Sequence, residues 1–213
     1  MRLRPSGKKG PLAVQLSSMI AYQRDEAETW EHMALTRARA VCGDESLIDD
    51  VTREVASVLS QPRDKAAVAT AIRDMRELIA QEKGDGDRAD LKIMRGGLLD
   101  VEFIAQFLQL AHANARPELL AVGTAEVLRR ATRLGILTAE QGERLLAAHR
   151  FYTDVVQMQR VLLPVDMKPK AAPPAVRRRI ASGAGLPDEQ RLDLEIAEMA
   201  EAVTALYRTI LSA

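Results

Sequence analysis

The sequence contains very little cysteine and few aromatic residues. Cys42 is the single cysteine, so no disulfide can form within the chain, as is typical of a reducing cytosol. We expect Cys42 to behave as a small buried hydrophobic residue. Aromatic residues make up 3% of the chain, and the abundance of Ala, Leu, Arg and Glu favours helices over sheets. Composition therefore predicts a cytoplasmic, all-α protein.

The sequence also lacks net charge and long apolar runs. Thirty basic and thirty acidic residues cancel, which gives no global electrostatic reason to expect a nucleic-acid partner. No apolar stretch is long enough to cross a bilayer, and no apolar core follows the basic N-terminus as it would in a signal peptide. The sequence therefore predicts no nucleic-acid partner and no membrane partner.

Helical periodicity covers most of the 213 residues. Expected N-caps are Asp44, Thr124, Asp188 and the capping-box pair Thr138 and Gln141. Residues 90–93 are expected to be extended, and a Pro-rich strap follows Pro164. The expected helices cover approximately residues 17–24, 26–41, 45–59, 64–81, 98–113, 124–134, 139–163, 175–182 and 189–211, with a short helix starting at Pro117.

The N-terminal residues 2–4 have the pattern of a strand end, which Pro5-Ser6-Gly7 terminates. A lone strand cannot satisfy its own backbone hydrogen bonds, so we expect a sheet in a preceding domain to pair with it. Arg2 and Arg4 would share one strand face, where they could hold a triphosphate or simply be solvated.

Two acidic residues, Asp100 and Glu102, interrupt a strongly apolar helix. Residues two apart on a helix diverge by about 200°, so these side chains cannot form a carboxylate pair. One alternative is that Asp100 is a capping-region acid and Glu102 a solvated one. The other is that one of them binds a cation or orients an arginine. The preceding Gly96-Gly97 could form a tight turn or offer backbone N–H groups to a phosphate.

The three histidines, His32, His112 and His149, are isolated from one another and from Cys42 in the sequence. None has a second His or Cys four residues away, so we expect core or surface histidines and no metal site.

Three ordered stretches together resemble the bacterial glutamine synthetase adenylyltransferase, the bifunctional enzyme that also removes the adenylyl group. They are Arg2 to Leu12, Tyr22 to Arg39 with its Trp30-Glu31-His32, and Lys92 to Gln106 with Gly96-Gly97-Leu98-Leu99-Asp100-Val101-Glu102-Phe103. The Trp30-Glu31-His32 stretch distinguishes this resemblance from one to the related uridylyltransferases.

The resemblance implies a helical bundle with a short N-terminal strand remnant of a nucleotidyltransferase domain. It implies three segments: residues 1–16 as the last strand and loop of that domain, 17–163 as the bundle, and 164–213 as the strap and C-terminal helices of the same bundle. The metal-binding aspartates are expected upstream of Met1, so no catalytic and no metal-binding residue is assigned in this chain. Residues expected next to the nucleotide site are Arg2, Arg4, Ser6, Gly7, Lys92, Gly96, Gly97, Asp100 and Glu102.

The implied activity is transfer of AMP from ATP, with Mg²⁺, to a tyrosine of glutamine synthetase. Glutamine synthetase, a PII signalling protein and a separate catalytic domain are the implied partners. We expect the isolated chain to be an incomplete, inactive piece of this enzyme. The alternative is a non-catalytic helical module that binds one of those partners. Replacing Asp100 by alanine is expected to leave the fold stable and to impair transfer once the catalytic domain is restored; unfolding would instead identify Asp100 as a structural cap.

Overall fold

The computed structural model describes residues 13–84, 90–164 and 167–212. Within these ranges the chain is helical and contains no strand. The strand expected at residues 2–4, together with Arg2, Arg4, Ser6 and Gly7, lies outside the described residues. The α-helices are α1 (Leu16–Asp25), α2 (Thr29–Leu35), α3 (Glu45–Leu59), α4 (Lys65–Lys83), α5 (Leu98–His112), α6 (Thr124–Arg133), α7 (Ala139–Leu162), α8 (Pro174–Gly183) and α9 (Glu189–Ile210); η2 (Pro117–Leu119) and η3 (Pro169–Ala171) are 3₁₀ turns.

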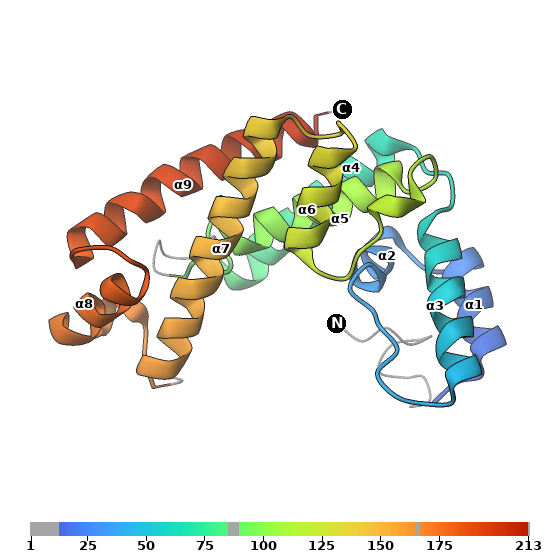
Figure 1. The fold of residues 1–213 in the computed structure, drawn as a ribbon, viewed down its shortest axis with the longest axis horizontal. Helices are drawn as coiled ribbons and strands as arrows, with labels where there is room; N and C mark the ends of the chain where they lie inside the picture. Colours follow the sequence, from blue (N-terminus) through green and yellow to red (C-terminus); the bar gives the residue numbers. More distant parts are fainter. Residues whose placement is uncertain (1–12, 85–89, 165–166, 213) are drawn as a thin grey trace.

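Helix α5 forms the centre of the bundle and packs against α2, α4, α6, α7 and α9. Its apolar residues continue around the helix, so it is buried on most sides, as such a composition requires. Val101, Ile104 and Phe107 are all 1% exposed or less. In Figure 1, α1 and α3 lie at one end of the molecule and α8 at the other. This arrangement places the Gly96-Gly97 turn, which precedes α5, inside the bundle.

Local signals located most helix starts correctly. Asp44 accepts a hydrogen bond from the Ser46 amide, and Asp188 accepts one from the Arg191 amide. Thr138 and Gln141 form the expected reciprocal capping box. The assignment of Thr124 as an N-cap is wrong, because Gly123 occupies that position and the helix begins at Thr124.

The helix expected over residues 26–41 is shorter in the structure. It starts after Glu28 and ends at Leu35, where the Thr36 hydroxyl donates to the Met33 carbonyl and competes with helical hydrogen bonding. The following segment is not helical, and Cys42 is exposed there. The expectation of a buried Cys42 is therefore wrong.

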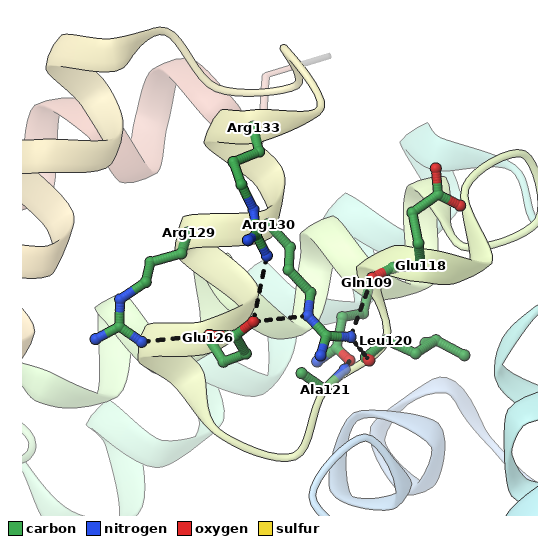
Figure 2. A network of polar contacts seen from close by, with 8 residues as sticks. All are labelled: Gln109, Glu118, Leu120, Ala121, Glu126, Arg129, Arg130 and Arg133. Carbon is green, nitrogen blue, oxygen red and sulfur yellow. Dashed lines mark hydrogen bonds and ion pairs between the residues drawn. The ribbon is translucent and has the colours of Figure 1, made fainter.

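The connection between α5 and α6 is held by a polar network (Figure 2). Arg130 of α6 donates to the carbonyl oxygens of Glu118 and Leu120, at 3.1 and 2.5 Å, and pairs with Glu126. The side-chain oxygen of Gln109 on α5 accepts a hydrogen bond from the Ala121 amide. The loop therefore has a fixed path across the bundle, although it has little regular structure.

No described helix combines the length and the apolar character needed to cross a membrane.

Candidate functional site

The turn before α5 requires glycine at both positions. Gly96 has a φ of +74°, and a Cβ there would lie 2.0 Å from the Ala200 carbonyl oxygen on α9. A Cβ on Gly97 would lie 2.5 Å from the Leu91 carbonyl oxygen. The tight turn is thus confirmed as the reason for the two glycines, and it lets α9 approach the backbone closely.

The backbone amides of this turn donate hydrogen bonds to other groups of the protein. The Gly96 N–H donates to Asp100 Oδ2 at 2.6 Å, and the Gly97 N–H donates to the Met94 carbonyl at 3.0 Å. The expected extended segment at residues 90–93 is also wrong, because Ile93 and Met94 donate back to the Asp90 carbonyl in a turn. Because both amides already donate within the protein, they are not available to bind a phosphate, which was the alternative for Gly96-Gly97.

Asp100 forms a buried ion pair with Arg76 of α4. Arg76 Nε lies 2.5 Å from Asp100 Oδ1, and the two side chains are 1% and 5% exposed. Arg76 also donates to the Ile93 carbonyl, and the Tyr152 hydroxyl of α7 donates to the Gly96 carbonyl. The network joins α4, α5, α7 and the turn. The alternative in which an acid orients an arginine is confirmed for Asp100.

Burial sets the electrostatics of this network. Loss of water raises the pKa of Asp100, while the Arg76 guanidinium and the Gly96 amide act in the opposite direction. Burial, together with the charge of Asp100, also raises the pKa of the Tyr152 and Tyr207 hydroxyls. Each Asp100 oxygen accepts an N–H, so the arrangement suits an ionised carboxylate that holds the fold together.

Glu102 points to a different environment, as the spacing predicted. It pairs with Arg37 at 2.7 Å, and its side chain is 20% exposed. His149 of α7 lies near this pair: burial lowers its pKa, the charge of Glu102 raises it, and Arg37 lowers it. Arg37, Glu102 and His149, which we call the outer cluster, form a polar surface contributed by α5, α7 and the segment after α2.

Lys92 and His32 belong neither to the Asp100–Arg76 network nor to the outer cluster. Lys92 is exposed and lines a cleft on another part of the surface. His32 is buried, with its Nε2 2.8 Å from the Gln23 carbonyl oxygen, and burial lowers its pKa. In the described ranges, no three Asp, Glu, His or Cys side chains are placed to hold one metal ion.

Sequence reasoning missed the partners of both acids. Arg76 follows Ile72 by four residues, as Ile72 follows Val68, so its position on the buried stripe of α4 could have been noticed. Arg37 gave no such signal, because it lies beyond the end of α2 and meets Glu102 only through tertiary packing.

Two family models match successive parts of the chain. Residues 1–54 match the family described as glutamate-ammonia ligase adenylyltransferase. Residues 73–211, which include α5 and both acids, match the family described as GlnD PII-uridylyltransferase. The first match therefore includes α1 and α2, and the second includes α5 to α9.

Three relatives share one description, bifunctional glutamine synthetase adenylyltransferase/adenylyl-removing enzyme. The protein of Xanthobacter autotrophicus is 44% identical over 99% of this chain, and that of Bradyrhizobium diazoefficiens is 43% identical over 99%. The Agrobacterium fabrum protein is 41% identical over 97%. The chain spans about a fifth of these relatives, with 21% of each covered. Residues 73–211, more than half of the chain, thus belong to the domain family described as GlnD PII-uridylyltransferase, and nearly the whole chain is a relative of bacterial glutamine synthetase adenylyltransferases.

Proposed function

We propose that this chain forms the helical part of the adenylyl-transferring unit of a glutamine synthetase adenylyltransferase. The complete enzyme would transfer AMP from ATP to a tyrosine hydroxyl of glutamine synthetase and so regulate nitrogen assimilation. The observation that carries this proposal is the identity of more than 40% to enzymes of that description along nearly the whole chain. Because the chain spans about a fifth of their length, we infer that it acts together with other parts of such an enzyme.

Within this unit the two acids have different roles. Asp100 and Arg76 fix the turn at Gly96, and they are too buried to meet a substrate directly. Glu102 is partly exposed and held by Arg37, so it is the acid of this motif that can face a neighbouring domain or a bound nucleotide. We therefore assign Glu102 as a positioning residue at the border of the nucleotide site.

We propose that the magnesium ligands of the complete enzyme are supplied by a part other than this helical region. Mg²⁺ prefers carboxylate oxygens in an octahedral arrangement, and no cluster of three candidate ligands occurs among the described side chains. The outer cluster offers a single carboxylate that is already paired with Arg37. We infer that the metal-binding aspartates belong to another part of the enzyme, and no step through the metal is assigned to these residues.

The proposed partners follow from the same relationship. Glutamine synthetase is the protein named in the description of the relatives, and a PII signalling protein is named in the description of the second matching family. We propose glutamine synthetase as the substrate protein, a PII protein as a regulator, and ATP as the donor of the adenylyl group.

The test is transfer of labelled AMP from Mg-ATP to unmodified glutamine synthetase. The chain is assayed alone and with the preceding part of the Xanthobacter autotrophicus relative added in trans. We expect label on glutamine synthetase only in the second case, and none when the acceptor tyrosine is replaced by phenylalanine. Label produced by the chain alone would contradict the proposal that the catalytic groups lie elsewhere.

Matched variants test the assignment of Glu102. In the reconstituted assay, Glu102→Gln should reduce transfer, whereas Glu118→Gln, at an exposed glutamate on η2, should not. Absence of label with a folded chain, combined with nucleotide-independent binding to glutamine synthetase or PII, would instead support a non-catalytic interaction module.

A further inference from the structure

A cleft of about 560 Å³ lies where four segments meet. These segments are the end of α4, the turn at residues 90–93, the end of α7 and the strap at residues 167–169. Four cationic side chains line it, together with a single acidic residue, Asp90, among the described lining residues; the cations are Lys83, Lys92, Arg160 and Lys168. Residues from distant parts of the sequence thus bring positive charge to one concave surface.

These cations differ from many of the surface arginines. On α8 and α9, for example, Arg177 pairs with Glu189 and Asp193, and Arg191 pairs with Glu195. None of the four cleft cations forms an ion pair with a carboxylate in the parts of the chain that the structure describes. Their charge is therefore not neutralised by those carboxylates.

Helix dipoles account for part of this charge. Lys83 and Arg160 lie in the last turns of α4 and α7, where a cation interacts favourably with the negative end of the helix. Each helix end is equivalent to about half a negative charge. Among the described lining residues, about two units of positive charge remain after both helix ends and Asp90 are counted, and Lys92 and Lys168 contribute them from outside any helix.

The cleft also has an apolar wall. Val156 and Leu163 of α7 and its C-cap, with Met167 of the strap, line it and are half-buried. A bound anion could therefore place charged groups on the lysines and the arginine and an organic group against this wall.

We propose that this cleft binds a polyphosphate chain, supplied as inorganic triphosphate or as the phosphates of a nucleoside triphosphate. Lysine and arginine form charge-assisted hydrogen bonds to phosphate oxygens, and a linear chain of phosphates can contact several cations that line one cleft. The proposal concerns a ligand of the same chemical class as the ATP of the proposed function, and it is tested separately, because the titration below measures binding by this chain without glutamine synthetase or any other protein.

The test is calorimetric titration of sodium tripolyphosphate into the 213-residue chain without divalent cations. Binding should weaken as salt increases, because the cations are exposed to solvent. The double variant Lys92→Gln/Arg160→Gln should bind about tenfold more weakly or worse. The matched control Arg178→Gln/Arg179→Gln, at exposed residues of α8, loses the same charge and should bind like the unmodified chain. Equal weakening in both double variants would overturn the proposal.

A second measurement locates the ligand without relying on variants. Amide chemical shifts of the unmodified chain are recorded during the same titration, and the largest changes should fall at residues 83, 90–93, 160 and 167–169. Absence of binding, or changes concentrated elsewhere, would overturn the proposal. ATP binding more tightly than tripolyphosphate would identify the nucleotide as the source, and equal binding would identify the phosphate chain alone. Adenosine binding at this cleft as tightly as tripolyphosphate would contradict the proposal, because adenosine carries no phosphate.

Discussion

Asp100 and Glu102 lie two residues apart on α5, yet they occupy opposite environments. The Asp100–Arg76 pair is almost completely removed from water, whereas Arg37, the partner of Glu102, is 47% exposed. A buried charge without its partner is costly, while a solvent-exposed ion pair contributes little to stability. Two acids of one motif therefore have different roles: Asp100 maintains the fold, and Glu102 is available at the surface.

The largest expected effect comes from removing the buried acid. Asp100→Ala leaves the Arg76 guanidinium buried without its carboxylate, so we expect the free energy of unfolding to fall by about 3–5 kcal/mol. Urea denaturation followed by circular dichroism measures this change. A loss below about 1 kcal/mol, the size typical of an exposed pair, would remove the distinction between the two acids.

The next effect concerns the turn that Asp100 stabilises. Gly96→Ala introduces both an unfavourable positive φ and a clash with the Ala200 carbonyl, so we expect a loss of about 3 kcal/mol. Gly135→Ala is the matched control, because Gly135 has a φ of +69° but open space around its Cβ position. This control should lose only about 1 kcal/mol. Similar losses at the two glycines would show that α9 does not pack tightly against the turn.

An intermediate effect is expected from acidification. Burial lowers the pKa of His32, His112 and His149, so the folded protein favours their neutral forms relative to the unfolded chain. The stability from these groups is present above their unfolded pKa of about 6.5 and is lost as the pH falls through their folded values. Denaturation midpoints should therefore decrease below about pH 6.5.

The variant His149→Gln separates the contribution of the outer cluster to this pH dependence. It should make the decrease in stability on acidification shallower, because one of the three groups no longer titrates. An unchanged profile would mean that His149 is not buried enough to favour its neutral form.

The smallest effect is expected at the outer pair. Glu102→Ala should reduce the free energy of unfolding by less than about 1 kcal/mol, since an ion pair with an exposed partner contributes little. Arg37→Ala should have a similarly small effect, measured by the same urea denaturation. A loss comparable to that of Asp100→Ala would place Glu102 among the residues that maintain the fold.

Local sequence patterns were sufficient for much of the fold. Helix periodicity and caps such as Asp44, Asp188 and the Thr138 capping box depend on neighbouring residues, and they located the corresponding helices correctly. Cys42 was misplaced because α2 ends at Leu35, where the Thr36 hydroxyl bonds the Met33 carbonyl, and the apolar periodicity did not indicate that end.

The site was less predictable because its contacts are long-range. The spacing of Asp100 and Glu102 correctly indicated that they diverge, but it could not show that Arg76 lies 24 positions before Asp100 in the sequence and meets it in the core. The sequence alone suggested a stable fold for Asp100→Ala, whereas the buried pair predicts the opposite. Long-range pairing decides this difference, and no local pattern encodes it.

Double-mutant cycles on the two ion pairs test the central distinction most directly. One cycle uses Arg76→Ala and Asp100→Ala, the other Arg37→Ala and Glu102→Ala, with free energies of unfolding measured under identical conditions. We predict a coupling energy of several kcal/mol for the buried pair and less than about 1 kcal/mol for the outer pair. Equal coupling energies would contradict the assignment of Asp100 to the fold and Glu102 to the surface.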